Sequence, residues 1–446
     1  MRFIPYNKFI MLKIIIILQL TTLLIYLNAN IVNVGEMGVA LHLLIEFVGL
    51  TSLLFAMLLV KKKLYFHIHF FFFLLLMCWI AFRIVFDLND LEYLKQLTVA
   101  TTGGALLFYI IGASLGLTRH SLASLRSDIK IEKYTILIFC FLSIWMLYNF
   151  SQRLHDSLFY LKDINGSYQR SGNFLSISFI VVSFAYFNLV LKYISQSATI
   201  LARFFWLSVY TLSTLMALAG SQLFGSNSAT AVILGAYLIT LVMSLVTAKK
   251  TVWLSYLKHK LVLPWSKRLV KNLSLMALIG LAIFVGALVL IIGLTGFDIT
   301  SLRLLGFGSG SNTSLLSRVD ILLETGANQL NYAPLIGNMN VAYITTGNAG
   351  RTLHSFFPYV MANLGLVGLL IVLVLFTNVL LQLYCEAKQA KYTGLYGYQL
   401  NMVALYSIFL FLYILFFANL STAIEWPVLW FTLGFISKPF IFSERV

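Results

Sequence analysis

The stretch FFPYVMANLGLVGLLIVLVLFTNVLLQLY, residues 356–384, decides the class of fold. It carries no charged residue, and only a few polar side chains interrupt it. A helix needs about 20 mostly apolar residues to cross the hydrocarbon layer of a membrane. The run is therefore predicted to be a membrane-spanning helix.

Similar apolar runs follow one another along the whole chain. The 446 residues are 60% hydrophobic and 10% charged, whereas a soluble globular domain carries roughly 25% charged residues. We therefore expect an all-α, polytopic integral membrane protein with about 12 transmembrane helices, forming a single membrane domain over residues 1–446. The predicted spans are 9–27, 38–60, 64–86, 96–117, 134–150, 172–190, 204–220, 228–247, 273–294, 356–384, 399–417 and 428–441.

The basic residues indicate the orientation, because they gather in alternate loops, such as Lys61–Lys63 and the run from Lys249 to Lys271. Cytoplasmic loops carry an excess of Lys and Arg, so this side is predicted to be cytoplasmic, with both termini inside. The same pattern accounts for the formal charge of +16, and we expect no nucleic-acid partner. The first span lacks a small-residue cleavage site, so it is interpreted as a retained helix and not as a removed signal peptide.

Two outer loops are long enough to carry a function. Residues 151–171 form the shorter one, and residues 295–355 form a large one rich in Gly, Asn, Ser and Thr. Loops of this length in a compact protein are usually functional or disordered. The aliphatic and aromatic side chains in the large loop favour a folded cap with short amphipathic helices.

Arginine is the basic residue of these loops that points to phosphate chemistry. The large loop contains Arg303, Arg318 and Arg351 and no lysine, and the shorter loop ends at Arg170. The planar guanidinium group can bind phosphate oxygens through two parallel hydrogen bonds. These arginines are therefore candidates to hold a lipid-linked phosphate or pyrophosphate. The alternative is that they are ordinary basic residues extending from helix ends to the membrane surface.

Histidine supplies the candidate base. His354 is the single histidine of the large loop and stands directly before a predicted span. An imidazole can accept a proton near neutral pH, and a nearby arginine would keep it neutral. A structural role at the helix start is the alternative.

His42 and Glu46 lie four residues apart in the second predicted span. They form either a functional pair or a buried pair that holds two helices together.

Other chemistry has little support in the sequence. There is no Gly-Lys-Ser/Thr loop for nucleotide phosphates, and no spacing of Cys, His or acidic residues predicts a metal site. The three cysteines lie within or at the end of apolar runs, so we expect no disulfide framework. No cofactor is predicted.

Two segments, SRVDILLETGANQLNYAPLIGNMN (317–340) and LHSFFPYVMANLGLVGLL (353–370), contain an outer-loop arginine, a Pro-(apolar)₂-Gly turn, a histidine and a Gly-(apolar)₂-Gly segment. In this order the elements resemble the C-terminal half of the O-antigen polymerase and O-antigen ligase superfamily. YQRSGNFLSIS (168–178) is similar to its other arginine motif. The chain departs from the family at two positions, where Ser226-Asn227 replaces a Ser-Arg pair and Asn363 replaces an acid.

The resemblance implies a metal-independent and nucleotide-independent glycosyltransferase of the bacterial inner membrane. Its donor and acceptor would be undecaprenyl-pyrophosphate-linked oligosaccharides, met on the periplasmic face. By this resemblance His354 would be the catalytic base, and Arg170 and Arg318, with Arg351 or Arg303, would bind the pyrophosphate.

Three activities remain open at this stage. The leading one is an O-antigen polymerase of lipopolysaccharide biosynthesis. The first alternative is an O-antigen ligase, which transfers the same glycan to lipid A–core. The second is a flippase of lipid-linked oligosaccharide, although secondary transporters tend to show two similar halves that this sequence lacks. Binding of a chain-length regulator protein also remains open.

Overall fold

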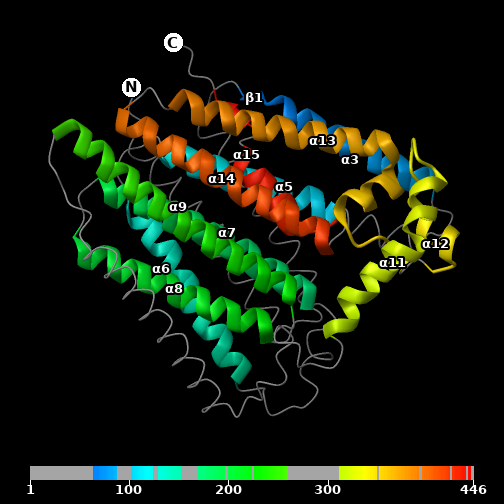
Figure 1. The fold of residues 1–446 in the computed structure, drawn as a ribbon, viewed down its shortest axis with the longest axis horizontal. Coiled ribbons are helices and arrows are strands. Elements are labelled where there is room, and N and C mark those ends of the chain that lie inside the picture. Colours follow the sequence, from blue (N-terminus) through cyan, green and yellow to red (C-terminus); the bar gives the residue numbers. More distant parts are fainter. Residues whose placement is uncertain are drawn as a thin grey trace. The chain divides into compact units, whose positions relative to one another are not determined.

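Figure 1 shows the fold of the chain in a computed structural model. The structure describes residues 64–87, 102–123, 129–151, 168–195, 199–223, 226–259, 311–348, 351–390, 394–421, 424–437 and 440–442. The predicted spans 9–27, 38–60 and 273–294 lie outside these residues, as do His42, Glu46, Arg303 and most of the 151–171 loop.

Helices make up nearly all of the described part, and seven of them are long and apolar enough to cross a membrane. By helix length and hydropathy the chain is thus a multi-pass membrane protein, as predicted. The seven apolar segments are Ile68–Asp87, Ile131–Tyr148, Gly172–Tyr193, Leu201–Gln222, Asn227–Thr247, Phe356–Lys388 and Asn401–Leu420. Two shorter apolar helices, Gly104–Gly116 and Pro427–Ser437, accompany them.

The chain divides into two compact units, and the first of them contains four described helices. These are α6 (Ile129–Ser151), α7 (Tyr168–Ser195), α8 (Ile200–Leu223) and α9 (Asn227–His259). Helix α7 is the centre of this unit, because it packs against the other three and its apolar segment is almost entirely buried. An ion pair between Lys192 and Glu132, with Nζ and Oε1 2.7 Å apart, ties α7 to α6.

The second unit holds the remaining described elements. They are β1 (Leu64–Phe66), α3 (Ile68–Asp87), the π-helix η1 (Thr102–Leu106), α5 (Leu107–Ala123), α11 (Ser311–Tyr332), α12 (Val341–Thr346), α13 (Phe356–Ala390), α14 (Gly394–Ser421), α15 (Pro427–Ser437) and β2 (Phe440–Phe442). Helix α13 runs alongside α3 and α14 (Figure 1). The strands pair antiparallel, with Tyr65 opposite Ile441.

Helices α5 and α15 form the most extensive pair of this unit. Their backbones approach closely where Gly112 and Gly116 of α5 meet the backbone at Phe431 and Phe435 of α15. Small residues four apart permit such an approach between apolar helices. Side chains from Val428 to Ser437 are all buried, so α15 lies in the core of the unit.

The last predicted span, 428–441, is wrong in its extent. Helix α15 ends at Ser437, and the chain is again described in strand β2 from Phe440. Pro439 follows the helix in the sequence, and a proline both lacks an N–H donor and disfavours helix at the preceding residue. An 11-residue helix extends only about 16 Å, which is too short to cross the hydrocarbon layer alone.

Candidate functional site

The large predicted loop, residues 295–355, contains helices in its described part. Helix α11 carries Arg318 in its first half, and the short helix α12 follows the turn after α11. Helix α12 ends at Thr346 and is capped by Gly347, whose φ of 70° is left-handed and whose N–H donates to Tyr343 O at 2.7 Å. A small apolar cluster of Ile321, Leu330, Val341, Leu353 and Ala362 joins α11 and α12 to α13.

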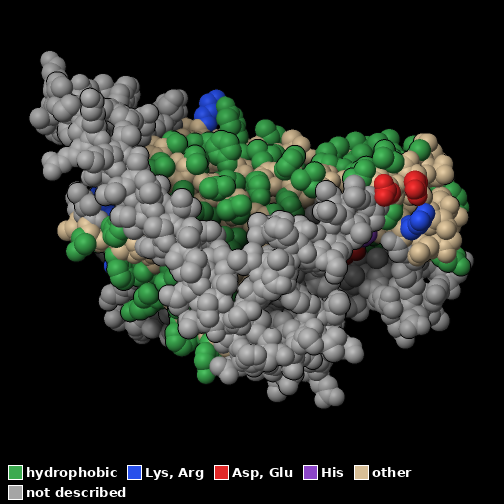
Figure 2. All heavy atoms as spheres, turned by 60° about the horizontal axis from the view of Figure 1, so that its bottom comes forward, with side chains coloured by type: hydrophobic (Ala, Val, Ile, Leu, Met, Phe, Trp, Pro, Cys, Tyr) green, Lys and Arg blue, Asp and Glu red, His purple; other side chains and the backbone are tan. Residues whose placement is uncertain are grey.

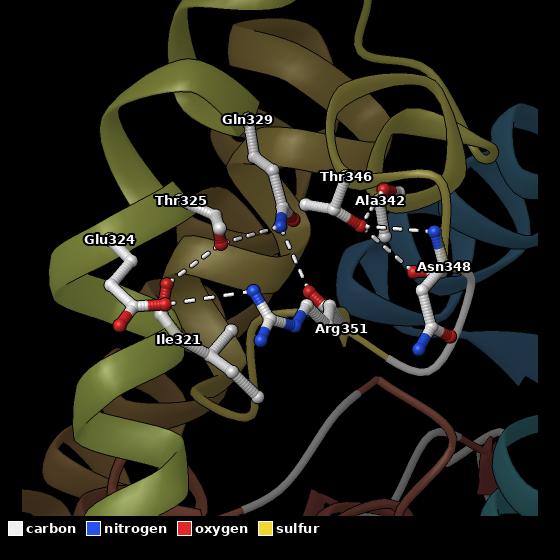
Figure 3. Close-up of polar contacts among 8 residues, drawn as sticks. All are labelled: Ile321, Glu324, Thr325, Gln329, Ala342, Thr346, Asn348 and Arg351. Atoms are coloured by element: carbon white, nitrogen blue, oxygen red, sulfur yellow. Dashed lines mark hydrogen bonds and ion pairs between the residues drawn. The ribbon is translucent and has the colours of Figure 1, made fainter.

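A polar network fixes the segment that leads to His354 (Figure 3). The side-chain amide of Gln329 donates to Arg351 O at 2.9 Å and contacts Thr325 Oγ1 at 3.0 Å. The Arg351 guanidinium points toward Glu324, with Nη1 and Oε2 3.6 Å apart. The backbone of Arg351 is therefore held by α11, while its charged group stays at the surface.

His354 and Arg318 are brought close together by the packing of α11 against α13. Both side chains are partly buried. Burial lowers the pKa of His354 below its ordinary value, because the charged form loses hydration, and the nearby positive charge of Arg318 lowers it further. The imidazole is consequently neutral at pH 7 and can accept a proton.

Asn419 of α14 holds the start of α13 beside His354, and no sequence pattern singles this residue out. Its Oδ1 accepts from Phe357 N at 3.0 Å, and its carbonyl accepts from Ser355 Oγ at 2.6 Å. The first N–H groups of a helix have no partner within the helix. Asn419 thus supplies from another helix the cap that is usually local.

The two glycine motifs of the unit meet each other. Gly337 and Gly365 both have left-handed φ angles, 70° and 67°, and a Cβ on either one would overlap the backbone of the other segment. Helix α13 is kinked at Gly365, and the Pro334–Gly337 turn lies against this kink. In the structure, the two glycines allow the backbone of the turn and the backbone of α13 to pack directly against each other.

Arg83 and Asp87 hold this turn from α3, and sequence analysis missed both. They form a buried ion pair. Arg83 also donates to Gly337 O at 2.8 Å, and Asp87 Oδ2 accepts from Met339 N at 3.0 Å. Their sequence pattern is two opposite charges four residues apart within an apolar span. His42 and Glu46 have the same spacing.

Arg170 lies in the first turn of α7, in the other unit, and its side chain is outside the described residues. Two residues further on, Gly172 packs tightly against Ser226. Ser226 Oγ accepts from Ala229 N at 3.3 Å and caps α9. The arginine motif and the Ser226-Asn227 position are thus neighbours within that unit.

The face of the second unit around α11 and α12 carries charged groups on an apolar background. Hydrophobic side chains cover much of the described surface in Figure 2, and acidic and basic side chains lie close together at the α11–α12 end. Among the described residues, no three His, Cys, Asp or Glu side chains lie close enough to hold a metal ion.

Chemically, this arrangement offers a neutral base and guanidinium groups at the end of a long membrane helix. Such a set can accept a proton and stabilise a developing anion. Comparison with known proteins gives no relative, because no family model, curated protein or solved structure matches the chain.

Proposed function

We propose that this protein is an O-antigen polymerase, a glycosyltransferase that joins undecaprenyl-pyrophosphate-linked oligosaccharide repeats at the periplasmic face of the inner membrane. The observation that supports the proposal best is the neutral, partly buried His354 beside Arg318 at the start of α13. The sequence resemblance described above supplies the class of substrate.

In the proposed reaction His354 accepts the proton of the acceptor hydroxyl as its oxygen attacks the anomeric carbon of the donor sugar. The bond between that carbon and the pyrophosphate oxygen breaks, and undecaprenyl pyrophosphate leaves with the electron pair. Arg318 stabilises the negative charge on the leaving group. Arg170, Arg351 and Arg303 are the further candidates for binding the pyrophosphate.

The proposal includes an orientation. About 12 helices would cross the inner membrane with both termini cytoplasmic, and residues 295–355 would form the periplasmic loop that carries the site. A reporter fused after Asn312 should then report a periplasmic position, and one fused after Lys260 a cytoplasmic position. The opposite pair of results would invert the topology and remove the proposed site from its substrate.

A gel of lipopolysaccharide from a strain lacking the gene tests the activity. A polymerase predicts loss of the O-antigen ladder while the core-plus-one-repeat band remains. Complementation with the wild-type gene should restore the ladder, and complementation with His354→Ala should not.

The same gel separates the alternatives. Loss of the single-repeat band as well would contradict polymerase activity and favour a ligase or a flippase. Lipid-linked glycan would accumulate on the periplasmic side for a ligase and on the cytoplasmic side for a flippase.

A further inference from the structure

Many backbone groups of the turn from Ala333 to Met339 are hydrogen-bonded to protein atoms. Polar groups of an irregular segment at the surface can bond to water, whereas at membrane depth they must be satisfied by protein. Here α3 and α13 supply all but one of the partners, and the turn itself supplies the other. The contacts are Gly337 N to Ala333 O (2.7 Å), Leu366 N to Pro334 O (2.8 Å), Val367 N to Leu335 O (3.1 Å), Asn338 N to Ala362 O (3.1 Å), Arg83 Nη2 to Gly337 O (2.8 Å) and Met339 N to Asp87 Oδ2 (3.0 Å).

The partners from α3 place the turn below the end of a membrane span. Ile68–Asp87 is 20 residues long, so the whole of it is needed to cross about 30 Å of hydrocarbon. Arg83 lies four residues, or about 6 Å, from the Asp87 end of this span. Trp79 lies about 12 Å from that end, and its indole N–H donates to Leu364 O at 3.0 Å, next to the kink of α13.

The length of α13 agrees with this depth. The apolar segment Phe356–Lys388 has 33 residues, which is far more than one crossing needs. The kink at Gly365 leaves a second part, from Leu366 onward, that is long enough to span by itself. Because the first N–H groups of this second part are bonded to the turn, they do not need water.

The side chains at the tip of the turn are apolar and exposed. Leu335 keeps 65% of its surface accessible and Ile336 keeps 48%. Exposed apolar side chains also occur on both spanning helices, namely Phe82, Val85 and Phe86 of α3 and Leu366, Val367 and Leu370 of α13. Leu335 and Ile336 are therefore as apolar and as exposed as the positions that these spans present to lipid.

We infer that Ala333–Met339 is a re-entrant turn, held inside the hydrocarbon layer at the Asp87 end of α3, whose Leu335 and Ile336 contact the acyl chains of the bilayer. The buried Arg83–Asp87 pair makes this depth possible, since it binds two backbone groups that water cannot reach there. The inference does not depend on the proposed activity.

Site-directed spin labelling of the full chain in vesicles of phosphatidylethanolamine and phosphatidylglycerol tests the inference. Cys78, Cys140 and Cys385 are first replaced by alanine, and one nitroxide is attached at Leu335→Cys or, in a second variant, at Ile336→Cys. Collision with dissolved oxygen reports hydrocarbon, and collision with a water-soluble nickel chelate reports water. Leu370→Cys on α13 is the control for lipid, and Asn348→Cys after α12 is the control for water.

The expected result is a ratio of oxygen to nickel collisions at 335 and 336 that lies nearer to that of position 370 than to that of position 348. A ratio nearer to that of position 348 would place the turn in water and overturn the inference. Low collision rates with both reagents would show that protein, such as a second copy of the chain, covers the turn, and would also overturn lipid contact.

Discussion

Two arginine–carboxylate pairs of the same unit have opposite surroundings. Arg83 and Asp87 each keep 7% of the side-chain surface accessible, and together they bind two backbone groups of the re-entrant turn. Arg351 and Glu324 keep 50% and 61%, and their closest atoms are 3.6 Å apart. The first pair is a structural clamp, whereas the second leaves a guanidinium group exposed on the side of α11.

This difference in burial predicts that the two pairs have different roles, the buried pair in stability and the exposed arginine in activity. Removing one partner of a buried pair leaves an uncompensated charge, whereas an exposed pair contributes little to stability. The residues around the kink of α13 should therefore control folding. His354, Arg318 and Arg351 should control activity instead.

The largest expected effect is on stability, at the buried pair of Arg83 and Asp87. Arg83→Met should lower the free energy of unfolding by about 3–5 kcal/mol, because Asp87 would stay buried without its partner. Arg351→Met is the matched control and should cost about 1 kcal/mol or less. Thermal unfolding of both variants in detergent micelles would measure the difference. Equal losses would mean that burial does not distinguish the two pairs.

The second effect is on activity alone. His354→Ala should reduce the rate of glycan extension by about 10²–10⁴-fold, the usual contribution of a positioned base, while the melting temperature stays near that of the wild type. Asn348→Ala, at an exposed position after α12, is the control and should keep full activity. An active His354→Ala variant would remove this residue from the mechanism.

The membrane spans could be predicted because each depends on one local run of apolar residues. The run at 356–384 corresponds to α13, which begins at Phe356 as predicted and ends at Ala390. The span predicted at 428–441 failed because the same apolar composition also suits a short buried helix followed by a strand. Hydropathy does not distinguish burial in protein from burial in lipid.

The contacts of the site were only partly predictable. Arg318 and His354 could be singled out from residue type and position. The left-handed φ angles of Gly337 and Gly365 depend on each other across 28 residues of sequence, and the capping of α13 by Asn419 depends on a helix more than 60 residues away. Such long-range partners leave no local pattern in one sequence.

The third prediction concerns pH dependence. Burial and Arg318 both lower the pKa of His354, so the neutral base should persist below pH 6.5, and activity should fall only as pH drops through the lowered pKa. Arg318→Gln should move this acid limb to higher pH, although not fully to 6.5, because burial remains. A pH profile of kcat/KM would show the shift.

Arg318→Lys separates charge from shape in the same experiment. Lysine keeps the positive charge, so the acid limb should stay near its wild-type position, yet activity should fall because an ammonium group lacks the planar fork of donors. Full activity of this variant would argue against bidentate binding of pyrophosphate. An unshifted acid limb in Arg318→Gln would show that Arg318 does not act on His354.

The smallest effect is expected at the exposed pair. Glu324→Gln should change the free energy of unfolding by about 0.2–1 kcal/mol, since exposed ion pairs contribute little. Thermal unfolding in low and high salt would measure it, and the difference from the wild type should shrink at high salt. A loss comparable to that of Arg83→Met would contradict the distinction between the two pairs.

The pairing of α5 with α15 has a consequence for how the protein is made. Some 310 residues separate Gly116 from Pro427 in the sequence, which at 5–20 residues per second is about 15 to 60 s of synthesis. During that interval the glycine-lined side of α5 has left the ribosome while α15 has not. Insertion factors or lipid must occupy that side until α15 arrives, and a ribosome that stalls before α15 would leave a nascent chain exposed to proteolytic quality control.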